Sequence, residues 1–240
     1  MELREPHVVF IDMLAHGIHP TIVVSSRHLL KDCCPRTPLE WLRFVVGPYA
    51  LYRATVSRDP QRNYATYQLF HTLSNTDLFL RAVRSWFRYG LTPLDNVNKV
   101  PPAVTHRALR WAFMAWVSEM VWMIRVREWS GLLTHHIPLL AFAPWAFQVL
   151  PSAAVSLLLL EGQSVPKALY VVQACLGLPH TSYKRWSHWL RIPILLFVRL
   201  RVLGEGLSRT THPTKRAFMG LLVALDVRTL FQTVRALQKH

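Results

Sequence analysis

An uncharged run over residues 137–160, IPLLAFAPWAFQVLPSAAVSLLLL, is the feature that most restricts how this chain can fold. About 20 consecutive apolar residues in a helix span the hydrocarbon layer of a bilayer, which is about 30 Å thick. The run also contains Pro138, Pro144 and Pro151, and each proline leaves a backbone carbonyl without its helical partner. We therefore expect a kinked transmembrane segment or a re-entrant hairpin here, with a buried pair of core helices as the soluble alternative.

The charge and the aromatic content suggest apolar surface placed next to a polyanion. The chain of 240 residues carries a formal net charge of +15, although 51% of its residues are hydrophobic. Its nine tryptophans have side chains that favour the boundary between hydrocarbon and water. The first residues of the chain include several acidic side chains, so this segment resembles neither a signal peptide nor a transit peptide.

Three cysteines cannot supply a disulfide framework, and this favours a reducing or organellar compartment over secretion. The adjacent Cys33 and Cys34 are interpreted as buried free thiols, with fatty acylation as the alternative.

Periodicity and proline positions predict helices and no strand. The expected helices cover residues 39–57, 60–73, 75–89, 102–130, 137–160, 165–177, 181–204 and 214–238. The fold class we expect is all-α, a membrane-associated helical bundle with amphipathic interfacial helices and one or two kinked transmembrane or re-entrant segments. Four regions follow along the chain: an N-terminal extension (1–38), a basic amphipathic helical region (39–131), an apolar membrane segment (132–162) and a C-terminal helical region (163–240).

The best-defined amphipathic helix is expected within SNTDLFLRAVRSWFRYGL, residues 74–91. Ser74 is placed to cap its start, Asp77 to reach back to the cap, and Gly90 to end it in a left-handed turn. One arc of this helix holds Phe79, Ala82, Val83, Trp86 and Phe87, and the opposite side holds Arg81, Arg84 and Arg88. We interpret it as a helix in a membrane interface, with its arginines on lipid phosphates. A core-facing helix with a solvated basic edge is the alternative.

Two other segments combine tryptophan with charge. Residues 108–129 carry Arg110 and Glu119 inside an apolar helix, and buried charges need partners, so we expect this helix to pack against its neighbours. Residues 183–202 are interpreted as an interfacial anchor that leads into a short apolar insertion. The lipid-contacting side chains expected there are Lys184, Arg185, Trp186, Trp189 and Arg191.

Patterns that carry catalysis are scarce. The chain has no glycine-rich phosphate loop and no nucleophile elbow, and its acidic residues form no pair suited to acid–base chemistry. Asp59 has a simpler role as the cap ahead of Pro60. The twelve histidines show no metal-binding spacing supported by a carboxylate or a cysteine. We therefore expect a protein that is not an enzyme, without a cofactor or a metal site.

The order of these features resembles that of the peroxin-11 membrane proteins. LYRATVSRDPQRNYATYQLF is similar to the opening element of that family, with Arg58, Asp59, Arg62, Tyr67 and Gln68 in comparable places. LFLRAVRSWFRYGL and VSEMVWMIRVREWSGLL resemble its later arginine-rich helix and apolar element, and the resemblance spans most of residues 50–238. It implies remodelling and division of peroxisomal or glycosomal membranes by insertion of an amphipathic helix.

A structural role is the alternative that the sequence leaves open. Basic, tryptophan-rich chains without catalytic groups are typical of supernumerary subunits of mitochondrial inner-membrane complexes, such as a respiratory complex or an ATP synthase. In either case the expected partners are a phospholipid membrane, in particular anionic lipid such as cardiolipin, and other membrane subunits or further copies of the chain. RNA binding would explain the basic charge but not the uncharged run, so no nucleic-acid partner is expected.

Overall fold

Every regular element that the structure describes is a helix. The structure is a computed structural model, and it describes residues 35–56, 58–91, 100–129, 132–137, 155–179, 181–211 and 213–238. The helices in these ranges are α3 (Pro38–Trp41), η1 (Leu42–Val46), α4 (Gly47–Thr55), α5 (Pro60–Tyr89), α6 (Pro102–Val126), η2 (Leu132–His136), η3 (Leu158–Lys167), α10 (Ala168–Cys175), α11 (Thr181–Pro193), η4 (Ile194–Arg199), α12 (Leu200–Arg209) and α13 (Pro213–Gln238). The expected all-α class is confirmed for these residues.

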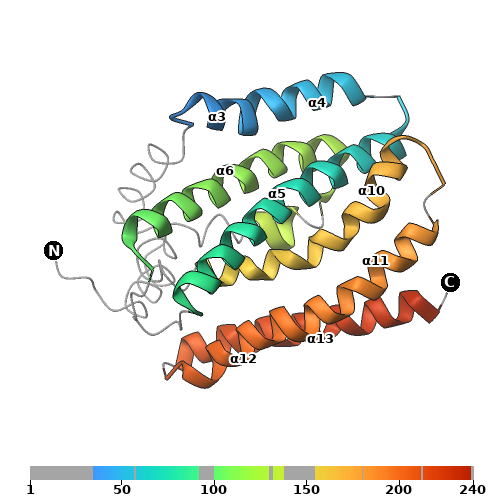
Figure 1. The fold of residues 1–240 in the computed structure, drawn as a ribbon. Coiled ribbons are helices and arrows are strands. Elements are labelled where there is room, and N and C mark those ends of the chain that lie inside the picture. Colours follow the sequence, from blue (N-terminus) through green and yellow to red (C-terminus); the bar gives the residue numbers. More distant parts are fainter. Residues whose placement is uncertain are drawn as a thin grey trace.

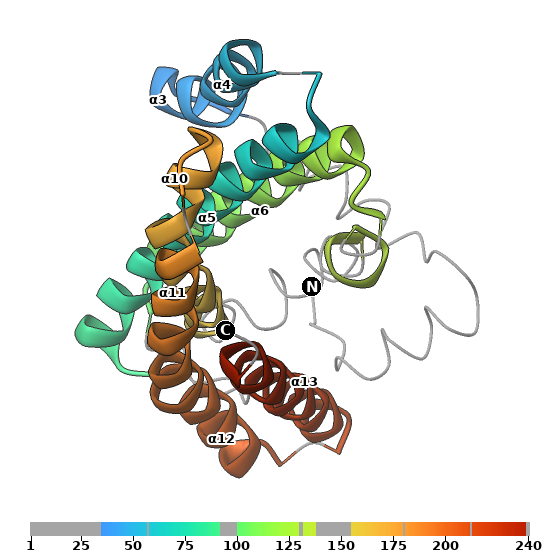
Figure 2. The same cartoon turned by 90° about the vertical axis from the view of Figure 1, so that its right-hand side faces the viewer.

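The long helices α5 and α6 lie side by side at the centre of the molecule (Figure 1). The segment from η3 through α10 packs along α5, and α3 and α4 lie above α5 and α6 in Figure 1. On the opposite side α11, η4 and α12 form one continuous helical stretch that runs beside α13 (Figure 2). The central pair therefore lies between α3 and α4, which precede it in the chain, and the segment from η3 through α10, which follows it and separates it from α11.

Caps and prolines fix several helix ends where the sequence predicts them. The Asp59 carboxylate accepts a hydrogen bond from the backbone amide of Gln61 at 2.8 Å, and Pro60 is the first helical residue of α5. Gly90 ends the same helix with φ at 77°, a conformation that costs glycine little. Both boundary predictions are confirmed.

A π-helical turn, η1, lies directly before α4, in which Pro48 is the second residue. Pro48 has no backbone N–H, so it cannot donate a hydrogen bond to the carbonyl of Phe44, one helical turn earlier. Instead the Ser118 hydroxyl of α6 donates a hydrogen bond to that carbonyl at 2.9 Å. The irregular turn is thus stabilised by the helix beneath it.

The predicted boundary at Ser74 is wrong, because α5 continues without interruption from Pro60 to Tyr89. Ser74 is buried inside the helix and caps nothing. Asp77 forms ion pairs with Arg43 at 3.0 Å and with Arg81 at 2.7 Å. Asp77, which was expected to reach back to the cap, instead pairs with Arg43 of η1 and with Arg81 of its own helix.

The main core lies between α5, α6 and residues 155–160. Leu78, Ala112 and Leu159 are each fully buried there. Burying a leucine side chain contributes about 1.5–3 kcal/mol, so this contact is the main reason the three segments stay together. Close packing also explains Gly162, because a Cβ atom at that position would lie 2.6 Å from the Phe79 ring.

Both charged residues of α6 that were expected to need partners have them. Arg110 forms an ion pair with Glu40, which is buried at the start of α3. Burial would raise the pKa of the Glu40 carboxyl, but hydrogen bonds from the Arg36 and Thr37 amides, together with Arg110, lower it. Glu119 is fully buried and faces two histidines. The prediction that this helix packs against its neighbours is confirmed.

Most of the uncharged run, residues 138–154 with all three of its prolines, lies outside the described residues, as do Cys33 and Cys34. The described end of the run is protein core, since Val155, Leu158 and Leu159 are buried. Within the described ranges one helical stretch, Val155–Cys175, could cross a membrane by length and composition, with a mean hydropathy of 1.2. Buried core helices of soluble proteins also meet this criterion. The region boundary expected after residue 162 falls inside the same stretch.

Candidate functional site

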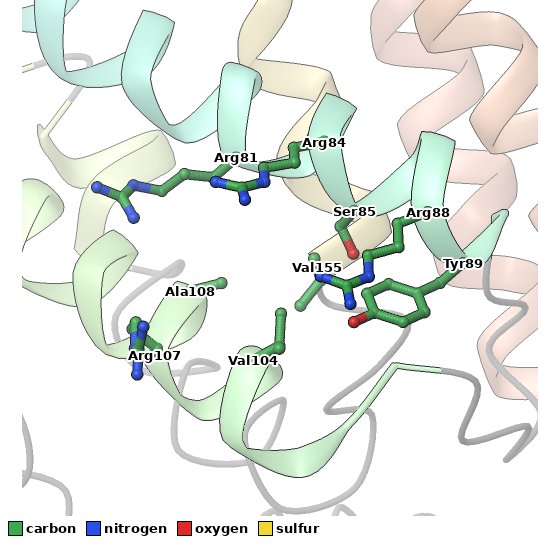
Figure 3. A pocket seen from close by; sticks show the side chains of 9 residues that line it. All are labelled: Arg81, Arg84, Ser85, Arg88, Tyr89, Val104, Arg107, Ala108 and Val155. Carbon is green, nitrogen blue, oxygen red and sulfur yellow. The ribbon is translucent and has the colours of Figure 1, made fainter.

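The three arginines predicted on one side of α5 line a single pocket. Arg81, Arg84 and Arg88 contribute to it from α5, and Arg107 contributes from the facing helix α6 (Figure 3). The remaining lining residues are Ser85, Tyr89, Val104, Ala108 and Val155. We call this site the four-arginine pocket. The periodicity of α5 grouped three of these arginines on one side of the helix, whereas Arg107 was missed because only the folded helix pair brings it near.

The four-arginine pocket is suited to an anion by charge and by size. None of its lining residues is acidic, and no described carboxylate pairs with Arg84, Arg88 or Arg107. Its volume is about 270 Å³. Since a water molecule occupies about 30 Å³ in the liquid, the pocket can hold a phosphate group and several atoms of its headgroup. Guanidinium groups bind phosphate oxygens in a bidentate manner, and a bound anion would offset the repulsion among the four cations.

Arg81 is the arginine of this group that the protein itself holds most firmly. Its guanidinium carbon lies 3.9 Å from the centroid of the Trp111 ring, and its Nε donates to the Asp77 carboxylate at 2.7 Å. Arg84, Arg88 and Arg107 are exposed. The pocket therefore combines one fixed cation with three that are accessible from solvent.

The apolar arc predicted for α5 packs mainly against protein. Phe79, Val83 and Trp86 are partly buried against the main core. Phe87 is 85% exposed. A different apolar row remains open on this helix, because Leu80 and Leu73, one and two heptads before Phe87, are each 57% exposed. Leu80 and Phe87 lie about one turn on either side of Arg84, so exposed apolar side chains flank the basic pocket.

Four of the five residues predicted for the second lipid contact share the exposed surface of α11. Lys184, Arg185, Trp186 and Trp189 are all exposed. Arg191 has a different place, because its guanidinium donates to the Gln163 side chain of η3 at 2.9 Å. Burial, followed by the nearby charge of Arg199, lowers the pKa of Arg191. The structure thus separates Arg191 from the other four residues.

His71 of α5, Glu119 of α6 and His136 of η2 form a compact cluster that the sequence analysis did not predict. Their ligand-type atoms all lie within 4.8 Å of one another. The partners are far apart along the chain, so no local spacing could reveal them. The one available signal was Glu119 itself, an acidic residue in the middle of an apolar helix.

Comparison with known proteins assigns no family to this chain. No family model matches it, and neither a curated protein nor a solved structure does.

Proposed function

We propose that this chain is a non-catalytic protein of an organellar membrane and that the four-arginine pocket binds the phosphate of an anionic phospholipid such as cardiolipin. The observation that carries this proposal is that Arg81, Arg84, Arg88 and Arg107 all line one pocket, which has no acidic lining residue. A basic residue near an anionic membrane surface contributes about 1 kcal/mol to binding. The pocket would thus favour anionic over zwitterionic lipid.

Exposed apolar side chains near the arginines favour a lipid over a free anion. Phe87 and Leu80 would enter the boundary between headgroups and acyl chains while Arg84 and Arg88 contact phosphates. Trp186 and Trp189, which are exposed beside Lys184 and Arg185, would form a second contact of the same kind. The stretch Val155–Cys175 is compatible with insertion but is also partly buried, with 44% of its most apolar window inside the protein.

Within this proposal, the biological role is remodelling and division of peroxisomal or glycosomal membranes. The support is the order of sequence elements that resembles the peroxin-11 proteins, together with the exposed row of Leu73, Leu80 and Phe87 on α5. Shallow insertion of such a row into one leaflet would expand that leaflet and promote curvature. Because Phe79, Val83 and Trp86 pack on the core, the inserted surface is this outer row rather than the whole predicted arc.

A second candidate, a structural subunit of a mitochondrial inner-membrane complex, is favoured by α13. This helix exposes Leu221, Leu225 and Phe231, each by more than 45%. Large exposed apolar side chains along one helix are typical of surfaces that contact other subunits. The same pocket would then hold a lipid at the edge of the assembly.

Organelle fractionation followed by alkaline carbonate extraction and native gel electrophoresis tests the proposal and separates the two roles. Recovery in the extracted membrane fraction of peroxisomes or glycosomes, without a large complex, supports the remodelling role. Co-migration with a respiratory complex or ATP synthase supports the subunit role. Complete release from membranes together with a soluble monomer would contradict both.

A further inference from the structure

A buried carboxylate in α6 lies between two imidazoles that come from other segments of the chain. The Glu119 Oε2 atom is 3.1 Å from His71 Nδ1 and 3.4 Å from His136 Nε2. The Glu119 side chain is fully buried, that of His136 is 3% exposed, and that of His71 is 15% exposed. The cluster is therefore enclosed by protein, with its most accessible side at His71.

The spacing of these three atoms matches the ligands of a small metal ion. Zinc bonds to histidine nitrogen and carboxylate oxygen are about 2.0–2.2 Å long, so ligand atoms at tetrahedral angles lie about 3.3 Å apart. Both distances to Glu119 Oε2 are close to this value, and the two histidine nitrogens lie within 4.8 Å of each other. A small inward movement of one imidazole would complete the triangle.

We propose that His71 Nδ1, Glu119 Oε2 and His136 Nε2 bind one divalent transition-metal ion, with zinc as the best fit. Two imidazoles and one carboxylate are a donor set that zinc and its neighbours in the first transition row prefer. Calcium and magnesium prefer sites made of oxygen ligands. The bound ion would compensate the buried negative charge of Glu119, which a hydrophobic surrounding otherwise disfavours.

A second layer of polar side chains supports this geometry. His71 Nε2, the ring nitrogen that does not face Glu119, lies 3.3 Å from Ser164 Oγ, and the same hydroxyl oxygen accepts a hydrogen bond from Asn75 Nδ2 at 3.3 Å. When Nδ1 holds the ion, Nε2 carries the proton and donates it to the Ser164 hydroxyl, which fixes the ring orientation. Partners of this kind are typical of histidines that bind metals.

The same residues suggest a structural role for the ion. His71 belongs to α5, Glu119 to α6 and His136 to η2, so one ion would join three separate segments of the bundle. Because the unfolded chain does not hold these ligands together, metal binding would stabilise the folded state. The competing explanation is a metal-free network in which an imidazolium pairs with Glu119, with the Lys167 charge nearby.

The test uses the full-length chain, purified in neutral detergent without a histidine tag, so it does not depend on lipid binding. After chelator treatment and dialysis, the protein is titrated with Co²⁺ as a spectroscopic probe and then with Zn²⁺. We expect one Co²⁺ per chain, a visible absorption band of a bound ion, loss of that band as Zn²⁺ displaces it, and a higher unfolding temperature with Zn²⁺.

Glu119→Gln keeps the size of the side chain and removes its charge. His106→Gln, on the exposed surface of α6, is the control for His136→Gln, because it makes the same substitution away from the cluster. We expect Glu119→Gln and His136→Gln to weaken Zn²⁺ binding by at least about 100-fold and Ser164→Ala by about 10-fold or more, with no change in the control.

Equal Zn²⁺ uptake by the wild type and by Glu119→Gln would overturn the proposal. If Glu119→Gln and His136→Gln do not fold, the titration of the wild-type chain alone tests the proposal. A wild-type chain that gives no cobalt band and no rise in unfolding temperature with Zn²⁺ contains the metal-free network.

Discussion

The guanidinium of Arg81 lies over the face of Trp111, with 3.9 Å between the guanidinium carbon and the ring centroid. This contact ties the arginine-rich face of α5 to α6, and Asp77 holds the same side chain from its own helix. A cation over an indole ring contributes about 0.5–2 kcal/mol, depending on how far it is desolvated. One wall of the four-arginine pocket is therefore set by the packing of α5 on α6, before any ligand binds.

Replacing glycine by alanine should have opposite effects at Gly162, which lies against α5, and at Gly204, which has open space beside it. Gly162→Ala places a methyl group where the Phe79 ring lies, and we expect it to destabilise the protein by about 1–3 kcal/mol. Gly204→Ala in α12 meets nothing within 4 Å and should stabilise its helix by up to about 1 kcal/mol. Thermal unfolding in detergent measures both variants. Equal unfolding temperatures for the two would contradict the described packing.

The buried pair of Glu40 and Arg110 predicts a pH-dependent contribution to stability. Because the pKa of Glu40 is lowered in the folded state, its carboxylate stabilises the protein above the ordinary carboxyl pKa of about 4.3, and this contribution is lost as the pH falls through the folded-state pKa. Glu40→Gln keeps a side chain suited to the capping box and removes the charge. We expect a loss of about 1–3 kcal/mol near neutral pH.

Urea unfolding of the wild type and of Glu40→Gln, near neutral pH and in acid, measures this contribution. The difference between the two proteins should shrink in acid as the wild-type carboxyl becomes protonated. A difference that stays constant across this range would mean that Glu40 contributes through packing alone.

The exposed indoles of α11 predict which tryptophans contact lipid. Trp186 is 64% exposed and Trp189 is 53% exposed, whereas Trp111 and Trp116 are both buried. With vesicles that contain brominated lipid, we expect quenching of part of the tryptophan emission. Trp186→Phe with Trp189→Phe should remove much of the quenched part, and Trp111→Phe with Trp116→Phe should not. Quenching that depends only on the buried pair would exclude α11 from the lipid contact.

Much of the fold could be predicted because local chemistry sets most helix ends. Asp59, Pro60 and Gly90 act through backbone geometry within one turn, and the structure uses them as predicted. The predicted break at Ser74 failed because a tertiary contact determines that region: the Asn75 amide donates to the Ser164 hydroxyl, 89 residues further along the chain. No local pattern reveals such a partner.

The same limit applies to the two candidate sites. Arg81, Arg84 and Arg88 could be grouped from the sequence because they share one helix face, whereas Arg107 joins them only through the packing of α5 on α6. His71, Glu119 and His136 come from three segments. The sequence showed that Glu119 needs a partner, but only the fold identifies the two histidines.

Vesicle flotation of the full-length chain tests the central claim most directly. The triple variant Arg84→Gln, Arg88→Gln and Arg107→Gln is compared with a control that loses the same charge elsewhere on the exposed surface, Arg53→Gln, Arg228→Gln and Arg235→Gln. At about 1 kcal/mol per basic residue, the pocket variant should bind anionic vesicles roughly 100-fold more weakly, and the control should lose much less. Equal losses in the two variants, or equal binding of the wild type to anionic and zwitterionic vesicles, would contradict the account.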